Sequence, residues 1–288
     1  MTDARPRLPL DAAYDPAETA AAVNAWRAHG LSVGFVPTMG ALHRGHIALV
    51  EQALSLTDRV VASVFVNPAQ FAPGEDFNAY PRTLESDAQK LGEAGCHLVY
   101  APTASAMYPK GFSTTISLTG PAQGLESAAR PHFFAGVATV VTKLLNQVRP
   151  DKAVFGEKDY QQLLVIRRLV ADLDMGVEIV ASDTVREPDG LALSSRNAYL
   201  SADERARAAK LNVILADFAD ALRAGAPVAT AQAKAQTAAD AAFDSVDYIE
   251  ARCAHTLAAL PDGELTQPAR VLAAVRVGKT RLIDNRGV

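Results

Sequence analysis

Two histidines spaced three residues apart and flanked by glycines make Val36–His46 the chemically most suggestive segment of the sequence. Gly40 and Gly45 carry no side chains where a nucleotide would approach the backbone. A helix that begins near His46 would offer N–H groups and a positive dipole end, and both suit phosphate. At this spacing His43 and His46 would face one phosphate and donate hydrogen bonds to its charge. The segment predicts a phosphate site.

Plainer interpretations of this segment stay open. An ordinary strand–turn–helix connection with two surface histidines would show the same pattern. A zinc site is disfavoured, because no nearby carboxylate or cysteine completes a ligand set. The phosphate interpretation therefore needs support from other segments.

A second segment of this kind is Phe155–Gln162, which again passes from an expected strand end into a helix. Gly156 permits the close approach of a ligand, and Lys158 would place a point charge on a phosphate. Asp159 would cap the helix or hold a ribose hydroxyl. An ordinary capped helix start explains Asp159 fully and Lys158 in part, but it requires neither the glycine nor the two adjacent glutamines that follow.

A third segment, Gly190–Asn197, lies beside an expected domain boundary and carries two hydroxyls and a guanidinium, on Ser194, Ser195 and Arg196. Such a set would clamp a phosphate, and a loop between domains would close over a nucleotide. Serine and asparagine are also common wherever helices are capped, so helix capping is the alternative.

Neutral amides follow the second expected strand, in the segment Phe65–Phe71. Asn67 and Gln70 would orient the hydroxyl or carboxylate groups of a small acid. The stretch that comes next, Asp76–Arg82, would form a lid or a dimer contact. A plain loop is the alternative for both stretches.

The first two-thirds of the sequence alternates expected strands with expected helices. Asp15 before Pro16 marks the start of a helix that Gly30 ends. Alternation of this kind predicts a parallel sheet covered on both faces, a Rossmann-like, doubly wound α/β domain that binds ligands at the carboxyl ends of its strands. The expected strands are Leu31–Val36, Arg59–Val66, His97–Tyr100, Ala153–Phe155 and Val177–Val180. The other expected helices are His46–Leu56, Leu84–Ala94, Gly136–Val148 and Tyr160–Leu173.

The character of the chain changes after Glu187–Gly190. Residues 201–243 are rich in alanine and predict two helices, while Val246–Cys253 and Arg270–Val277 predict short strands. We therefore expect a catalytic domain at residues 1–187 and a smaller C-terminal α+β lid domain at residues 188–288.

Composition excludes several classes of protein. The chain has 288 residues, 49% of them apolar, and a net charge of −4, so it has no broad basic field for nucleic acid. Only Cys96 and Cys253 are present, which argues against a disulfide framework and favours a reducing cytoplasm. The sequence shows no signal-peptide core and no apolar run near the roughly 20 residues that cross a bilayer. We therefore expect a cytoplasmic protein with no membrane partner.

Together, these segments resemble those of one enzyme family. Thr38–His46 resembles the HIGH motif of the nucleotidyltransferase superfamily, and Leu193–Arg196 occupies the place of its KMSKS-like loop. The wider sequence is similar to that of the pantoate–β-alanine ligases (pantothenate synthetases) from about residue 15 to the C-terminus. The matching segments are Pro37–Gly40, Phe65–Phe71, Tyr80–Thr83, Gly156–Gln162 and Ser194–Asn197.

The resemblance implies an ATP-dependent condensation of (R)-pantoate with β-alanine to pantothenate. ATP and pantoate would give pantoyl-adenylate and pyrophosphate, and β-alanine would then displace AMP. The implied catalytic residues are His46, His43, Lys158 and Arg196, with His46 the residue usually assigned as proton donor. The implied substrate contacts are Gln70, Gln162, Asn67, Thr38 and Met39. The implied ATP contacts are Met39, Gly40, Ala41, Leu42, His43, Arg44, Gly45, His46, Gly156, Glu157, Lys158, Asp159, Val185, Leu193, Ser194, Ser195 and Arg196.

Elementary chemistry changes one of these roles. A pantoate carboxylate is already a nucleophile at neutral pH, so the first step needs no general base. We therefore expect His46 to stabilise the charge on the pentacoordinate phosphorus, together with Lys158 and Arg196. Mg²⁺ should bridge the ATP phosphates, with Asp87 as a protein-side support. The resemblance also implies a homodimer.

One segment departs from the family's usual pattern. Where the family commonly shows arginine-proline-glycine-histidine-phenylalanine, this chain has Arg130–Phe134, so Phe133 holds the usual histidine position. His132 stands one residue earlier, where glycine is expected, and Ser127 replaces a preceding glycine. Either His132 reaches the same space from a shifted backbone, or one polar contact is absent.

Two other functions stay open on the sequence. A nucleotidyltransferase of the same superfamily would act on another small acid or on a phosphate ester. A catalytically silent nucleotide-binding sensor would use the altered loop, but the presence of the full set of catalytic candidates argues against it.

Overall fold

The computed structural model describes residues 8–71 and 77–288. The chain forms two compact units. The first comprises the chain up to Leu118 with His132–Gly156 and Ile166–Ser182, and the second comprises Thr119–Pro131, Glu157–Val165 and Asp183–Val288. The domain limits expected from the sequence, 1–187 and 188–288, stay a prediction. The first residue of the expected lid stretch, Asp76, lies outside the described residues.

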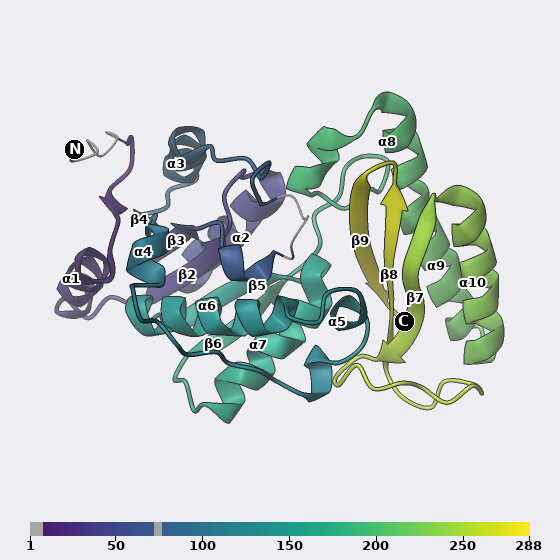
Figure 1. Cartoon of the computed structure of the whole chain (residues 1–288). Helices are drawn as coiled ribbons and strands as arrows, with labels where there is room; N and C mark the ends of the chain where they lie inside the picture. Colours follow the sequence, from purple (N-terminus) through teal and green to yellow (C-terminus); the bar gives the residue numbers. More distant parts are fainter. Residues whose placement is uncertain (1–7, 72–76) are drawn as a thin grey trace. The chain divides into compact units, whose positions relative to one another are not determined.

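A parallel sheet forms the centre of the first unit (Figure 1). In the part of the chain that the structure describes, its strand order is β1-β4-β3-β2-β5-β6, and neighbouring strands run parallel. The doubly wound α/β fold expected from the sequence is confirmed. The strands are β1 (Ala12–Ala13), β2 (Val33–Thr38), β3 (Arg59–Val64), β4 (Leu98–Tyr100), β5 (Lys152–Gly156) and β6 (Glu178–Ser182).

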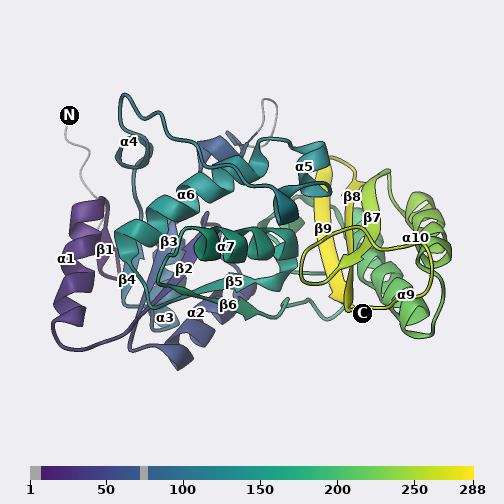
Figure 2. The same cartoon turned by 90° about the horizontal axis from the view of Figure 1, so that it is seen from below.

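Helices cover both faces of this sheet. They include α1 (Pro16–Arg27), α2 (Arg44–Leu56), α3 (Leu84–Glu93), α4 (Ala104–Met107) and α6 (Phe133–Val148). α2 packs on β2, β3 and β5 with α3 beside it, whereas α1 packs against α6 on the opposite face (Figures 1 and 2). Asp15 caps α1 as its place before a proline predicts, because its Oδ1 accepts from the N–H groups of Ala17 and Glu18 at 2.9 Å.

The core between the sheet and the helix pair α2–α3 fixes the strand register. Alternate strand residues point to this face, so a slip of one residue would turn the apolar set towards the other face. The buried members of this cluster are Val36, Leu42, Val50, Ala53, Val60, Ala62, Ala88, Leu91, Cys96, Val99 and Val154.

The strand order reverses beside β2. From β2 the chain builds outward through β3 to β4, and β5 then pairs with the other side of β2. In such sheets the ligand crevice opens at the carboxyl ends of the strands where the order reverses. The carboxyl ends of β2, β3 and β5 are Thr38, Val64 and Gly156. Three of the predicted site segments begin at these ends.

An antiparallel sheet of order β7-β8-β9 and a layer of helices form most of the second unit, as far as the described chain shows (Figure 1). α10 buries Val228, Ala231, Ala235 and Ala239, whose spacing of three and four places them on one helix face. This face packs against α9 and β7. The elements are β7 (Ser245–Cys253), β8 (Ala269–Val277), β9 (Thr280–Gly287), α5 (Glu126–Ala129), α8 (Ala202–Ala208), α9 (Lys210–Arg223) and α10 (Val228–Ala242). The remaining helix, α7 (Tyr160–Asp172), starts in this unit.

Several elements differ from the sequence expectation. α2 begins two residues early, at Arg44, because the His43 side chain caps it. α6 begins at Phe133 rather than Gly136. Residues 201–243 form three described helices instead of two, since α8 and α9 meet at Ala209. The strands β1 and β9 were not expected; β1 has only two residues, and buried Asp284 and Asn285 interrupt the apolar pattern of β9.

Gly136 in α6 lies against the 3-10 turn η1 (Pro68–Gln70), and a Cβ there would collide with the carbonyl group of Ala69. We expect Gly136→Ala to lower the free energy of unfolding by roughly 1–3 kcal/mol, the usual cost of overpacking. Thermal and urea unfolding measure this. Gly176→Ala is the matched control, because a Cβ there meets no described atom within 4 Å. Equal stability of the two variants would contradict the prediction.

Candidate active site

The turn after β2 is held in a conformation that most residues disfavour. Thr38 Oγ1 donates to the carbonyl of Ser63 at 2.6 Å and accepts from the N–H of Gly40 at 3.1 Å. Gly40 has φ +83°, and a Cβ there would lie 3.0 Å from Val64, so the position needs glycine. Ala41 adopts φ +51°, in the left-handed region that non-glycine residues rarely enter. The hydroxyl of Thr38, predicted to contact substrate, is thus used to shape the turn.

His43 and His46 lie side by side at the start of α2. Their ring centroids are 4.1 Å apart, with an interplanar angle of 36°. Nδ1 of His43 accepts from the N–H of Gly45 at 3.1 Å, and Nδ1 of His46 accepts from the N–H of His43 at 3.3 Å. A neutral imidazole that accepts at Nδ1 carries its proton on Nε2. Both neutral rings therefore have Nε2–H as their donor, which is the group a phosphate oxygen needs.

The same contacts bear on the predicted mode of phosphate binding. The sequence predicted that backbone N–H groups at the helix start would bind the anion. The N–H groups of Ala41, Leu42, His43 and Gly45 instead donate to side chains of the protein. Each N–H group has one hydrogen to donate, so these four are already engaged within the protein. Phosphate binding by this segment stays a prediction.

Asp87 of α3 is buried, and its carboxylate accepts hydrogen bonds from this turn. Its Oδ2 accepts from the N–H of Ala41 at 2.9 Å and from the hydroxyl of Thr83 at 3.0 Å, and its Oδ1 accepts from the N–H of Leu42 at 2.8 Å. The residue is 0% exposed. Three hydrogen bonds from within the protein thus engage both oxygens of the carboxylate. The carboxylate of Asp87 holds the turn, and its metal-supporting role stays a prediction.

Asn67 organises the segment after β3. Its Nδ2 donates to Oε1 of Gln70 at 2.9 Å and to the carbonyl of Gly136 at 3.2 Å. Its Oδ1 accepts from the N–H of Ala69 at 3.2 Å and from the hydroxyl of Tyr108 at 2.7 Å. These four bonds use its whole hydrogen-bonding capacity, and the residue is 0% exposed. Asn67 therefore fixes which end of the Gln70 amide faces it, and its predicted contact with substrate stays a prediction.

Tyr108 keeps its proton at neutral pH. Burial raises the pKa of its hydroxyl to about 12, although the hydrogen bond with Asn67 acts in the opposite direction. The hydroxyl therefore stays a donor to Asn67 throughout the neutral range.

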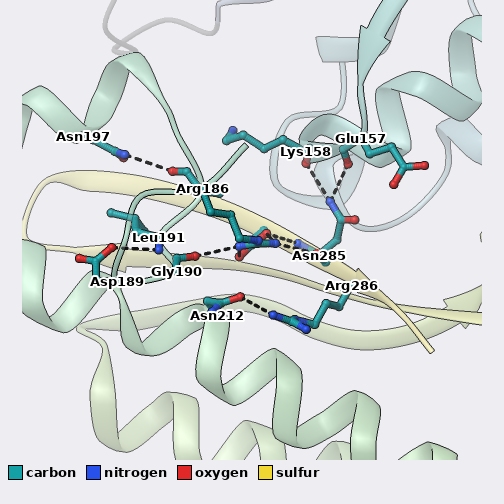
Figure 3. A network of polar contacts seen from close by, with 12 residues as sticks. Glu157, Lys158, Arg186, Asp189, Gly190, Leu191, Asn197, Asn212, Asn285 and Arg286 are labelled. Carbon is teal, nitrogen blue, oxygen red and sulfur yellow. Dashed lines mark hydrogen bonds and ion pairs between the residues drawn. The ribbon is translucent and has the colours of Figure 1, made fainter. Parts of the chain in front are cut away.

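In the second unit, the turn η3 (Glu157–Asp159) is held by the C-terminal strands (Figure 3). Nδ2 of Asn285 donates to the carbonyls of Glu157 and Lys158, both at 2.9 Å. Arg270 of β8 donates to Oε2 of Glu157 at 2.8 Å. The backbone that carries Lys158 is thus fixed, and the Glu157 carboxylate is already paired within the protein. The side chain of Lys158 is 20% exposed, and its Nζ lies 3.9 Å from Oδ2 of Asp159.

Val185 and Leu193, which were both predicted to contact ATP, are backbone neighbours. The N–H of Leu193 donates to the carbonyl of Val185 at 3.0 Å, across a short hairpin. Arg186 holds this hairpin by donating to the carbonyl of Gly190 at 3.0 Å (Figure 3). It also forms a bidentate pair with Asp284 at 2.7 and 2.9 Å. The paired guanidinium fixes the hairpin on β9.

The serines and arginine of the third predicted segment follow directly. Ser194 caps the 3-10 helix η4 (Ser195–Tyr199), because its Oγ accepts from the N–H of Arg196 at 3.3 Å. Asn197 donates to the carbonyl of Ala192 at 3.1 Å. The helix-capping alternative therefore describes Ser194 correctly, and Arg196 is half-buried in the same turn.

The two adjacent glutamines have different surroundings. Gln161 is buried: its Nε2 donates to the carbonyls of Pro121 and Gly124 at 3.0 and 3.2 Å, and its Oε1 accepts from the N–H of Glu126 at 3.1 Å. Gln162, the predicted substrate contact, is half-buried. Gln161 thus anchors the segment around α5, and the substrate contact of Gln162 stays a prediction.

The departure at Arg130–Phe134 falls at the start of α6. His132 precedes the helix, is exposed, and makes no capping hydrogen bond through its side chain. Phe133 is the first helical residue, with its ring centroid 5.0 Å from that of Phe134. Phe133, at the position where the resemblance implies a histidine, therefore has a ring without hydrogen-bonding nitrogen.

The residues that hold the candidate site residues in place were not predicted from the sequence. They lie in no local motif, since each acts on a segment far away in the chain. The one signal was a pair of polar residues inside the apolar pattern of the last strand. The missed residues are Tyr108, Arg186, Arg270, Asp284 and Asn285.

A doubly wound sheet with two adjacent imidazoles at its switch point is typical of the HIGH-motif nucleotidyltransferases, which is the class of enzyme that this fold and site define. The family model for pantoate-beta-alanine ligase matches residues 12–287. Pantothenate synthetase of Maricaulis maris (strain MCS10) is 66% identical over 263 residues, which cover 91% of each chain. The chain belongs to the pantoate–β-alanine ligase family.

Solved structures agree with this assignment. Pantothenate synthetase from Thermus thermophilus matches with a TM-score of 0.90 and 48% identity, over 96% of this chain and 99% of that one. Pantoate-beta-alanine ligase from Francisella tularensis, whose structure is complexed with beta-gamma ATP and beta-alanine, matches with a TM-score of 0.80 and 34% identity, over 96% and 97%.

The Tyr108–Asn67 contact can be measured by a double-mutant cycle. We expect Tyr108→Phe and Asn67→Ala each to lower the free energy of unfolding by about 1–3 kcal/mol, because each leaves buried polar groups without a partner. The double variant should lose less than the sum, by at least about 0.5 kcal/mol, since both changes remove one shared bond. Urea unfolding of the four proteins checks this, and strict additivity would contradict it.

Proposed function

We propose that this chain joins (R)-pantoate to β-alanine in two steps, through a pantoyl-adenylate. The ATP-dependent ligation of these substrates is the activity of the family to which the chain belongs. In the first step the pantoate carboxylate attacks the α-phosphorus of ATP and expels pyrophosphate. In the second step the neutral amine of β-alanine attacks the acyl carbon and loses a proton, and AMP leaves. The observation that carries the proposal is the adjacent pair His43 and His46 at the switch point of the sheet.

The two imidazoles would act by charge stabilisation. Negative charge builds on the phosphate oxygens as the carboxylate adds, and the carboxylate needs no base at neutral pH. Nε2–H donors on His43 and His46 are oriented in advance by the backbone contacts of their Nδ1 atoms. Oriented donors stabilise a transition state without reorganising during the reaction. Lys158 and Arg196 are proposed to share this role.

The proposed binding residues fall into those for pantoate and those for the nucleotide. We propose that Gln70 and Gln162 hold pantoate, with Gln70 also near β-alanine, and that Met39 contributes to substrate binding. The proposed nucleotide contacts are Met39, Gly40, Ala41, His43, Arg44, Gly45, His46, Gly156, Glu157, Lys158, Asp159, Val185, Leu193, Ser194, Ser195 and Arg196. Leu42 stays in the core, where it is 3% exposed, so we assign it a role in shaping the turn.

Mg²⁺ is proposed to accompany ATP as its phosphate complex. Mg²⁺ keeps several waters and is commonly held by substrate phosphates with few protein ligands. Among the described residues, no group of three or more histidine, cysteine, aspartate or glutamate side chains is placed to hold a metal ion. Such a chain suits an ion that arrives with its nucleotide.

A homodimer and a cytoplasmic location are further proposals that rest on the family resemblance. In the described chain no helix combines the length and the apolar character that crossing a membrane requires. Light scattering of the purified protein measures its molar mass, and the mass of a single chain would contradict the homodimer.

The activity assay uses purified protein with ATP, Mg²⁺, pantoate and β-alanine. We expect AMP and pyrophosphate, with AMP formation dependent on pantoate. ADP in place of AMP would contradict adenylation. AMP formed with another acid but not with pantoate would favour a different nucleotidyltransferase, and tight ATP binding without turnover would favour the sensor.

Substitution tests the two proposed donors. We expect His46→Ala and Lys158→Ala each to lower turnover by about 100-fold or more, the usual effect of removing one oriented electrostatic group. His29→Ala and Lys234→Ala are the controls, because both residues are exposed and lie outside the proposed site. Near-normal turnover of His46→Ala or Lys158→Ala would contradict the assigned roles.

A further inference from the structure

α3 holds the turn before the histidines from two sides. Asp87 accepts from the N–H groups of Ala41 and Leu42 at 2.9 and 2.8 Å. Lys90, three residues further along α3, donates from Nζ to the carbonyl of Leu42 at 2.7 Å. Residues three apart share one helix face, so α3 presents both charges to the same turn. The peptide groups on both sides of Leu42 are therefore fixed by charged side chains.

This arrangement constrains the residue that follows. The Leu42 side chain is buried in the core, so Leu42 cannot shift to compensate for a lost contact. The carbonyl bound by Lys90 belongs to the peptide group whose N–H donates to Nδ1 of His46. A rotation of this peptide would carry that N–H away from the imidazole. All of these contacts, from α3 to the imidazoles, lie within the first unit.

The positive φ of Ala41 explains why a clamp is needed. Residues other than glycine populate this region rarely, and they persist there when surrounding contacts impose it. Asp87 supplies such contacts, since one buried carboxylate accepts two successive N–H groups and the Thr83 hydroxyl. Without the clamp, the turn would relax towards a conformation in which the imidazoles are not held together.

We propose that Asp87 and Lys90 are positioning residues for the adenylation step, which fix the Leu42 peptide groups and thereby the orientation of His43 and His46. The inference rests on the proposed function of the two histidines. Neither side chain is required to touch a substrate. Their effect should appear in the rate of the chemical step more than in substrate binding, because a misoriented donor loses transition-state contacts first.

Lys90 gives the cleaner test, since it is exposed and its replacement should not prevent folding. We expect Lys90→Met to lower kcat for pantoate-dependent AMP formation about 10- to 100-fold, the range that a small misplacement can cause. KM for pantoate and β-alanine should change less than about threefold. Lys90→Arg should restore most of kcat, because a guanidinium can also donate to the Leu42 carbonyl. Glu93→Gln, on the same helix and exposed, is the control and should behave as the unaltered protein.

Asp87→Asn tests the other side of the clamp. An asparagine of the same size would direct an NH₂ group at one of the two backbone N–H donors. We expect a loss of kcat at least as large as that of Lys90→Met, with the half-saturating Mg²⁺ concentration unchanged. Activity restored by excess Mg²⁺ would overturn the inference, because it would make Asp87 a metal support.

Nitrogen-15 NMR of the imidazoles supplies a readout that does not depend on turnover. In the unaltered protein we expect His43 and His46 as Nε2–H tautomers, and we expect both clamp variants to shift these signals. Unchanged histidine signals and kcat, with only a lower Tm, would reduce the clamp to a structural role and overturn the proposal. If the unaltered protein forms no pantoate-dependent AMP, the proposed function fails. The positioning of the histidines is then still decided by these signals.

Discussion

The parallel pairing of β2 with β3 on one side and β5 on the other is the constraint on which the rest of the structure depends. Parallel pairing brings the carboxyl ends of these strands to the same edge, where a doubly wound sheet opens to a ligand. The histidine turn, the Asn67 network and Gly156 follow these three ends directly. Burial of alternate strand residues fixes the register, so the core decides where the chemistry lies.

The need to satisfy buried polar groups then separates the residues that hold the site in place from those proposed to act on a ligand. Thr38, Asn67, Asp87 and Gln161 look like ligand-binding residues, but their hydrogen bonds are made inside the protein. They hold the backbone or the side chain of a neighbour, and an unpaired polar group in their place would destabilise the fold. The residues proposed to act on a ligand are thereby held in place, which is the property that electrostatic catalysis needs.

The second unit applies the same principle with strands in place of α3. Asn285, Arg270 and Asp284 come from β8 and β9, and they fix two segments that precede them in the chain by roughly 100 residues or more. The turn that carries Lys158 is tied to the sheet by its own carbonyls, so the lysine side chain is not needed to hold the turn. Both units therefore place cationic or imidazole groups on backbones that other elements fix.

The sequence by itself determined the fold class, the family resemblance and the segments of the site, because apolar periodicity, capping residues and glycine positions are local signals. It placed Asp15 at the start of a helix and the two histidines beside each other, and it located the main strands and helices to within a few residues. Only the tertiary structure decided that Asp87 and Asn67 are buried supports and that the amides of the histidine turn are occupied. Only the tertiary structure revealed β9. The reason is physical: whether a polar group faces a ligand or the protein depends on partners brought close by folding, and those partners lie far away in the sequence.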